Sequence, residues 1–268
     1  MSDPTDTKEP LVTVAVVPVM PSPPSTSPDA SDTEGELFSP LTLAEDFTPL
    51  PAYKAAGTTE TDFDGLLPAD KPLRLHEDLK NGCGGQLWPA GMTLARYMLR
   101  YHAKSLVGKR ILELGAGGGL VGLAVARGCD LGDNPAPLCI TDQMEMFSLM
   151  RHNIALNGLE GKVEATLLNW GEPLPAAVIA DPPDVILAAD CVYFEPAFPL
   201  LQATLADLLA LQPGAVVYFC FMKRRRADIQ FLKQIRRRFR VAEIGDDGER
   251  DGLRRQGLFM FAISARGE

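Results

Sequence analysis

The sequence predicts an α/β fold in which a mostly parallel sheet is covered by helices on both faces. From about residue 71, short apolar runs alternate with segments whose apolar residues recur at helical spacing. A glycine cluster follows one of these runs, and two later runs end at an aspartate. Strands that alternate with helices form buried parallel sheets, and such sheets bind ligands beyond the carboxyl ends of their strands.

The first half of the predicted sheet has three strands. Arg110 to Leu114 is an apolar run that stops at glycine, as a buried strand does, and Gly128 and Gly158 stop the two helical stretches that follow. In chain order we expect a helix over 89–102, a strand over 110–114, a helix over 120–127, a strand over 138–141, a helix over 144–157 and a strand over 163–168.

The second half adds four strands and brings the sheet to seven. A proline opens its first helix, and Pro213-Gly214 lies just beyond the end of that helix, where these residues are favoured. In chain order we expect a strand over 184–189, a helix over 196–211, a strand over 215–222, a basic helix ending near 239, and strands over 241–244 and 258–264 that flank a charged turn.

Charge divides the chain near residue 70. The formal net charge of −9 by itself disfavours a nucleic-acid partner. Residues 1–70, however, hold 13 acidic residues against two lysines and 11 of the 22 prolines, whereas residues 71–268 carry a net charge of +2. The first segment cannot bury enough apolar surface to offset its ordering entropy. We therefore predict a disordered, acidic, Pro/Ser-rich tail over 1–70 and one domain over 71–268.

The five cysteines are scattered, without a CxxC pair or a neighbouring histidine, so the sequence predicts neither a disulfide framework nor a metal site. Isolated cysteines are typical of a reducing compartment. The longest apolar run near the start, over 11–20, is about half a membrane span and contains Pro18. We expect a cytoplasmic, monomeric protein without a membrane segment.

Glycines gather directly after the strand 110–114, in the run Glu113-Leu-Gly115-Ala-Gly117-Gly-Gly119. Glycine lets a ligand approach the backbone closely, but a turn of this kind occurs in several nucleotide-binding folds. The dinucleotide pattern GxGxxG is met only over 117–122, inside the following helix, and Glu113 would repel a pyrophosphate. A carboxylate there favours S-adenosylmethionine, which carries an amino group and no phosphate. Asp142 can accept hydrogen bonds from the ribose of either cofactor.

Five motifs in the same order resemble one family. The run ILELGAGGGLVGL (111–123) is similar to motif I of the class I methyltransferases, which have a Rossmann-like fold. The set GCGGQLWPAG (82–91), ITD (140–142), LNW (168–170) and ADCVYF (189–194) resembles the family-16 protein-lysine methyltransferases. Within that family, DLKNGCGGQLWPAG (78–91) is most similar to the fungal members that methylate a lysine of translation elongation factor 1-alpha. The resemblance covers roughly residues 71–265, and it implies that fold, S-adenosyl-L-methionine as cofactor and a protein substrate.

The resemblance also implies a role for each matched residue. Around the cofactor it places the glycines Gly115 and Gly117 for backbone contact, Asp142 on the ribose, Trp88 near the methionine moiety, Trp170 against the adenine, and Ala189 for a further backbone contact, beside the Glu113 that the residues themselves suggest. At the active-site end, Asp190 and Tyr193 match the family's Asp-x-x-Tyr signature, which implies that they hold and orient the acceptor amine. Methyl transfer from a sulfonium depends on positioning and requires no metal or enzyme nucleophile. The family's usual Thr or Ser after the second glycine is replaced here by Gly118.

Simpler readings stay open beside these. The tryptophans and Tyr193 could be packing residues, and Asp190 could cap the following turn. The basic segment 223–240 holds nine Lys or Arg against one acid, which is typical of a solvated helix face and also attracts acidic proteins or RNA. No aromatic array accompanies it, so we do not expect nucleic acid as the substrate. The alternatives to a protein-lysine enzyme are a methyltransferase acting on RNA or a small molecule, and a non-catalytic adaptor that binds the cofactor.

Overall fold

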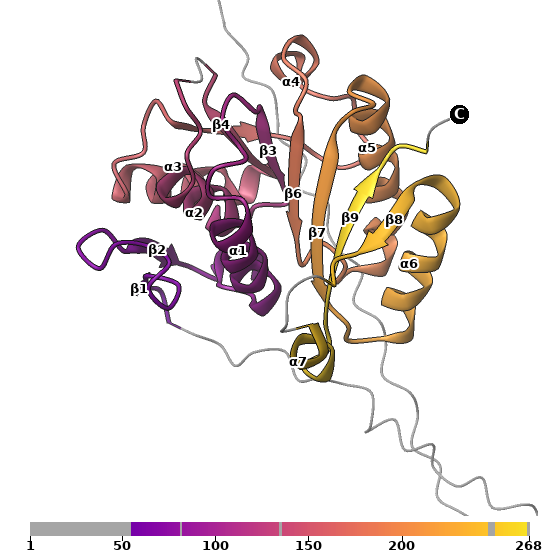
Figure 1. Cartoon of the computed structure of the whole chain (residues 1–268), viewed down its shortest axis with the longest axis horizontal. Coiled ribbons are helices and arrows are strands. Elements are labelled where there is room, and N and C mark those ends of the chain that lie inside the picture. The colour runs from indigo at the N-terminus through magenta and orange to yellow at the C-terminus, as the bar shows by residue number, and fades with distance from the viewer. Residues whose placement is uncertain (1–54, 81, 134–135, 246–249, 267–268) are drawn as a thin grey trace, which may run out of the picture. The chain divides into compact units, whose positions relative to one another are not determined.

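The computed structural model describes residues 55–80, 82–133, 136–245 and 250–266 (Figure 1). The strands are β1 Gly57–Thr61, β2 Leu73–Glu77, β3 Ile111–Leu114, β4 Leu138–Asp142, β5 Val163–Leu167, β6 Val185–Ala189, β7 Val216–Met222, β8 Arg240–Glu243 and β9 Leu258–Ser264. The helices are α1 Pro89–Tyr101, α2 Leu120–Gly128, α3 Met144–Leu156, α4 Ala176–Ala180, α5 Phe198–Leu211, α6 Arg226–Arg238 and α7 Arg250–Arg255, with short 3₁₀ turns η1 Cys83–Gly85 and η2 Glu195–Ala197.

Seven strands form the main sheet, in the order β5-β4-β3-β6-β7-β9-β8. Strands β3 to β7 pair in parallel, and β9 runs antiparallel to both of its neighbours. This arrangement confirms the predicted class I methyltransferase fold. The chain leaves β3 toward β4 on one side and later returns to β6 on the other. That reversal of strand order opens a crevice at the carboxyl ends of β3 and β6, which is where open α/β sheets bind ligands.

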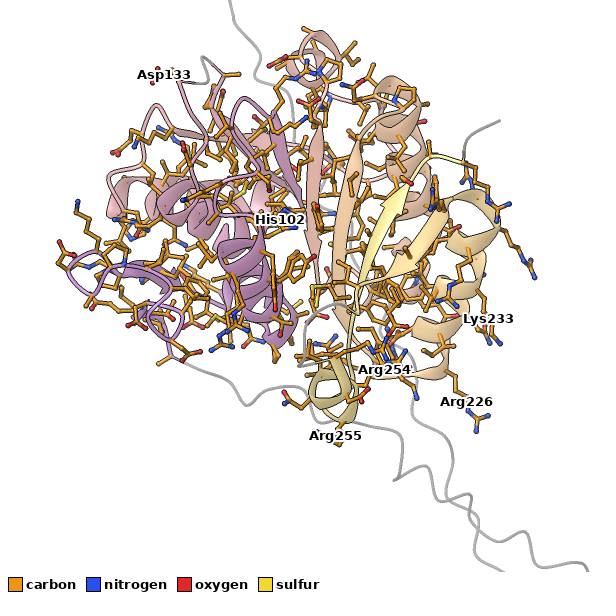
Figure 2. All side chains as sticks on the ribbon, viewed as in Figure 1. His102, Asp133, Arg226, Lys233, Arg254 and Arg255 are labelled. Atoms are coloured by element: carbon orange, nitrogen blue, oxygen red, sulfur yellow. The ribbon has the colours of Figure 1, made fainter. Side chains whose placement is uncertain are left out.

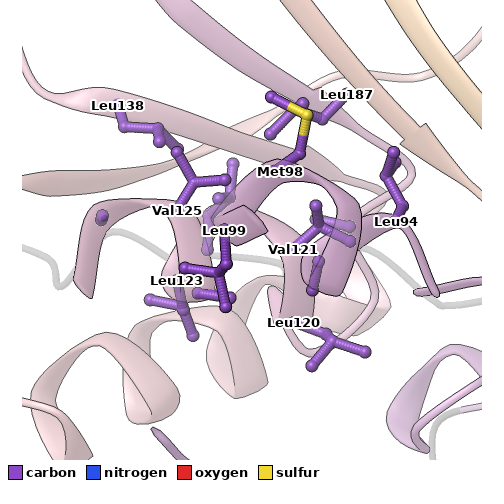
Figure 3. Close-up of a cluster of buried hydrophobic side chains, with 14 of the residues drawn as sticks. Leu94, Met98, Leu99, Leu120, Val121, Leu123, Val125, Leu138 and Leu187 are labelled. Atoms are coloured by element: carbon purple, nitrogen blue, oxygen red, sulfur yellow. The ribbon is translucent and has the colours of Figure 1, made fainter. Parts of the chain in front are cut away.

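Two apolar layers cover the two faces of the sheet because successive side chains of a strand point to opposite sides. Ile111 and Leu187 face the layer formed by α1, α2 and α3, whereas Leu112 and Ile186 face the layer formed by α5 and α6. Figure 3 shows the first of these layers, where leucines and valines of α1 and α2 pack beneath the sheet. Both faces are therefore closed, and ligand access is left to the ends of the strands.

The predicted boundary near residue 70 is wrong for residues 55–70. Strand β1 pairs antiparallel with β2, and Phe63 and Leu67 are buried in the core. Phe63 is flanked by Asp62 and Asp64, and Leu67 belongs to a run of only two leucines. The segment therefore gives no sustained strand or helix pattern in the sequence, yet these two side chains together anchor it. The expectation of disorder for residues 1–54 concerns a part of the chain outside the described residues.

The charged turn expected between the last two strands also contains structure, because α7 lies within it. The other predicted elements are confirmed to within a few residues of their ends. Among the described residues, no helix is both long and apolar enough to cross a membrane.

Candidate active site

A cavity of about 480 Å³ opens at the carboxyl ends of β3, β4 and β6. This volume is in the range of roughly 300–1,000 Å³ that small-molecule sites occupy. Each of the nine residues that the sequence assigns to the site lines this cavity: Trp88, Glu113, Gly115, Gly117, Asp142, Trp170, Ala189, Asp190 and Tyr193. The fold thus brings together motifs that lie on separate strands and turns.

The glycine loop between β3 and α2 forms one wall of the cavity. Gly115 and Gly117 have φ values of +64° and +56°, which side-chain-bearing residues rarely adopt. A Cβ at Gly117 would lie 2.3 Å from the carbonyl oxygen of Gly84, and a Cβ at Gly115 would lie 2.9 Å from Cζ2 of Trp170. Glycine is therefore required at both positions, both by backbone conformation and by the close approach of neighbouring groups.

Asp142 ends β4 and ties the glycine loop to the strand. Its Oδ2 accepts a hydrogen bond of 2.7 Å from the N–H of Gly117, and its Oδ1 accepts one of 2.7 Å from the N–H of Gln143. Burial raises the pKa of Asp142, while these backbone hydrogen bonds act against the shift. Each carboxylate oxygen keeps a second lone pair, so the residue can still accept the ribose hydroxyls that the sequence assigns to it.

Glu113 lies beneath the loop, and the helix that follows occupies its carboxylate. Oε2 accepts a hydrogen bond of 2.7 Å from the N–H of Gly122, and Oε1 accepts one of 3.3 Å from the N–H of Val121. Burial raises the pKa of Glu113 to about 8. The sequence reasoning pairs this carboxylate with an amino group of the ligand, but the structure shows it orienting the first turn of α2. Direct contact with the cofactor stays a prediction.

The raised pKa of Glu113 predicts that the protein loses stability as the pH rises. The folded state keeps the proton up to about pH 8, whereas the unfolded chain releases it near 4.5, so unfolding is favoured progressively between these values. The free energy of unfolding should fall by at most about 1.4 kcal/mol per pH unit from this group. Asp142 contributes with the same sign because its pKa is also raised.

Urea denaturation of the wild type and of Glu113→Gln at several pH values between 5 and 8 checks this prediction. The Glu113→Gln variant should show a flatter dependence than the wild type. The exposed Glu160→Gln change is the matched control and should follow the wild type. A wild-type stability that rises with pH, or an equal slope in Glu113→Gln, contradicts the prediction.

The two tryptophans of the chain come from different parts of the fold. The ring of Trp170, after β5, lies against Gly115 and packs partly into the layer below α5. Trp88 precedes α1, and its Nε1–H donates a hydrogen bond of 2.9 Å to the carbonyl of Cys83. Both rings line the cavity, as the predicted cofactor contacts require.

Asp190 follows β6 in a left-handed conformation with φ of +55°. Its carboxylate forms a bidentate pair with Arg224: Nη2–Oδ2 is 2.6 Å and Nη1–Oδ1 is 2.8 Å. Burial by itself lowers the pKa of Arg224. The hydrogen bonds and the negative charge of Asp190 act against burial, and the pKa of Arg224 is raised overall. Asp190 is thus bound to a partner within the chain, and its predicted hold on the acceptor amine stays a prediction.

Tyr193 lies at the exposed rim of the cavity beside Phe194 and Leu200, which are both about half exposed. Burial of part of the phenol raises the pKa of Tyr193 to about 12. The carbonyl of Tyr193 accepts a hydrogen bond of 2.5 Å from Arg225, which fixes this turn. The rim therefore offers an apolar surface and a neutral phenol where a substrate would enter.

Sequence reasoning missed Arg224 and also Asn153. Asn153 is fully buried on α3; its Oδ1 accepts the N–H of His76 at 2.8 Å, and its Nδ2 donates to the carbonyls of His76 at 3.2 Å and Gly118 at 2.9 Å. It therefore joins β2 to the glycine loop. An asparagine on the inward side of a helix is the signal that could have indicated it, because buried amides require partners.

Asn153→Ala should destabilise the protein by about 2–4 kcal/mol, because one N–H and two carbonyls lose their partner in a buried place. It should also weaken cofactor binding, since Gly118 belongs to the glycine loop. Thermal unfolding and calorimetric titration measure the two effects. Ser148→Ala on the exposed side of the same helix should change neither, and equal behaviour of the two variants would refute the assigned role of Asn153.

The residues at this cavity fit S-adenosylmethionine. The cradle at Gly117 would be filled by a single Cβ, Asp142 offers acceptors at the end of β4, and Trp170 offers a flat face. When bound, this cofactor supplies a methyl group on a positively charged sulfur. Within the described ranges, no group of three or more His, Cys, Asp or Glu side chains is placed to hold a metal ion.

Comparison with known proteins places the chain in a family. The profile of a family described as lysine methyltransferase matches residues 68–238. Protein-lysine N-methyltransferase EFM6 of Saccharomyces cerevisiae is 38% identical over 229 residues, which cover 77% of this chain and 91% of that protein. Protein N-lysine methyltransferase METTL21A of Danio rerio is 34% identical over 206 residues, 75% of this chain and 88% of that protein.

A shorter match, 33% identical over 53% of this chain and 58% of the relative, is to histone-arginine methyltransferase METTL23 of Xenopus laevis. Among solved structures, the METTL16 methyltransferase domain aligns with a TM-score of 0.47 at 14% identity, over 72% of this chain and 73% of that one, which adds no argument about function. The profile match and the two longer relatives establish that the chain belongs to the lysine methyltransferase family, as a protein-lysine N-methyltransferase whose methyl donor is S-adenosyl-L-methionine.

Proposed function

We propose that this enzyme methylates a lysine of translation elongation factor 1-alpha, acting as a monomer in the cytoplasm. The single observation that carries the proposal is the cavity. Its lining includes the glycine loop and Asp142, which suit the cofactor, and also the buried Asp190 and the exposed Tyr193, which suit an acceptor side chain. The choice of substrate rests on the motif 78–91, which resembles fungal enzymes acting on that factor, and on the 38% identity to EFM6.

The residues divide into two groups under this proposal. Gly115, Gly117, Asp142, Trp88, Trp170, Glu113 and Ala189 hold or support the cofactor. Asp190 and Tyr193 border the place where the lysine nitrogen meets the methyl group. The apolar rim fits the aliphatic stem of a lysine side chain, since that stem of methylenes packs well on apolar surface while the amine reaches inward. The five cysteines, all free, suit a reducing compartment.

A labelling experiment tests the proposal. The full-length enzyme is incubated with methyl-labelled S-adenosylmethionine and a lysate from cells that lack it. We expect one labelled band at the mass of elongation factor 1-alpha, and the same label on the purified factor, lost when one of its lysines is changed to arginine. Labelled RNA without labelled protein would overturn the assignment, and label on a different protein would refute this substrate.

A further inference from the structure

Arg224 and Asp190 form a nearly sealed charged pair in the wall of the active site. The side chains are only 14% and 4% exposed, and the two parallel contacts of 2.6 and 2.8 Å make the pair bidentate. Both residues line the cavity. Electrostatic interactions are strong where water is excluded, so this pair governs the local charge that an incoming substrate meets.

Several elements hold the pair in place. The N–H of Met222 donates to Oδ1 of Asp190 at 3.3 Å, and the guanidinium of Arg224 lies 5.0 Å from the centre of the Trp88 ring. The N–H of Arg224 donates to Asp228 at 2.7 Å, at the start of α6. Asp190 keeps a left-handed backbone conformation that only the surrounding structure can maintain. These contacts fix the position of the Asp190–Arg224 pair in the folded protein.

The other titratable groups around the pair do not change its net charge. Cys83 on η1 and Asp228 on α6 face Arg224, and Asp228 is itself bound by Arg225. On the side of Asp190, burial raises the pKa of the Cys191 and Cys220 thiols, which are therefore neutral near pH 7. Tyr193, Asp142 and Glu113 are further titratable groups that line the same cavity. The charge of Asp190 is thus cancelled chiefly by Arg224.

We propose that Arg224 is a positioning residue that neutralises Asp190 and thereby lets the acceptor lysine stand in the cavity as the free amine. An unpaired carboxylate at this place would hold the lysine as an ammonium ion and raise its pKa. An ammonium has no lone pair. The reaction needs one, because the lysine nitrogen forms the new N–C bond while the C–S bond of the donor breaks and its electron pair stays on sulfur. The proton of the lysine leaves to water beforehand.

The inference rests on lysine as the acceptor, and the pH dependence of the rate tests it. The initial rate of methyl transfer from S-adenosylmethionine to the lysines of a lysate lacking the enzyme is followed from pH 6 to pH 10. When the acceptor protein is saturating, the rising limb of the rate reports loss of the proton from the acceptor in the bound state. Arg224→Gln should shift the midpoint of this limb to a pH about one unit higher, and Asp190→Asn should shift it to a lower pH by a similar amount.

The double variant Arg224→Gln/Asp190→Asn should return the limb to its wild-type position, whatever the height of the rate. A merely structural role would lower all the rates without moving the limb in opposite directions. Arg226→Gln is the matched control, because Arg226 is exposed at the start of α6, points outward from the molecule (Figure 2) and does not line the cavity. It should leave the limb in place.

An unmoved limb in Arg224→Gln, or a double variant that behaves like Arg224→Gln, overturns the proposal. Calorimetric titration with S-adenosylmethionine shows whether each variant still forms the cavity. If Arg224→Gln fails to bind, Asp190→Asn decides alone, and an unmoved limb in that variant refutes the idea. Wild-type enzyme that labels lysate proteins other than elongation factor 1-alpha refutes the proposed substrate and leaves the Arg224 comparison valid.

Discussion

Gly117→Ala is expected to weaken the binding of S-adenosylmethionine by roughly 10- to 100-fold. The left-handed φ of +56° costs a residue with a side chain about 1–2 kcal/mol. The new Cβ would also lie 2.3 Å from the carbonyl oxygen of Gly84, a backbone atom that cannot rotate away. The loop must therefore move away from η1, and the hydrogen bond to Asp142 is lost with it. Calorimetric titration measures the effect.

Gly158→Ala is the matched control for this change. Its φ of +60° carries the same backbone strain, but no atom lies within 4 Å of the added Cβ. The variant should lose about 1–2 kcal/mol of stability and keep the wild-type affinity for the cofactor. If Gly117→Ala keeps the wild-type affinity for S-adenosylmethionine, or if Gly158→Ala loses as much affinity as Gly117→Ala, then the close contact with Gly84 has no influence on binding.

Asp190→Ala should abolish methyl transfer while the cofactor still binds. Removing this carboxylate leaves Arg224 charged, buried and without its partner, and breaking such a pair destabilises a protein by about 3–5 kcal/mol. The change also removes the acceptor-side carboxylate that the proposed function assigns to the lysine site. Transfer to protein and calorimetric titration with S-adenosylmethionine, both at a temperature where the variant is folded, separate chemistry from binding.

The other end of the same strand supplies the control. Asp184 precedes β6 and binds Arg110 through Oδ2 at 3.0 and 3.1 Å, away from the cavity, and the two side chains are 22% and 32% exposed. Asp184→Ala should cost about 1–2 kcal/mol of stability, less than Asp190→Ala because the pair is more exposed, and should leave transfer per folded molecule unchanged. Unimpaired transfer in Asp190→Ala would remove this residue from the proposed site.

The sheet and the cofactor end of the site follow closely from the sequence. Apolar runs such as 111–114 and 185–189 are long enough and sharply enough ended to be recognised as strands, and the glycines after β3 lie where the chain must turn tightly. Once the strands are known to be parallel, Gly115, Asp142 and Asp190 must meet at one edge. Local pattern and the geometry of parallel strands are sufficient for these conclusions.

Strand β1 and the pairing of Asp190 with Arg224 could not be predicted from the sequence. Strand β1 is short and polar, and it is held by pairing with β2 and by two buried side chains that give no periodic signal. Arg224 is one of nine basic residues over 223–240, and nothing in that run distinguishes it from Arg226, which faces solvent. Only the adjacency of β6 and β7 places its guanidinium against Asp190.

By itself, the sequence determined the order of the seven sheet strands along the chain, the glycine turn, the family and the residues that line the cavity, because these depend on local spacing and composition. The tertiary structure alone decided that Glu113 orients α2, that Asn153 joins β2 to the glycine loop, and that Arg224 neutralises Asp190. The last two are contacts between groups that lie 35 and 34 residues apart in the chain. Such contacts are selected by the burial of polar and charged groups, which must find partners in the fold.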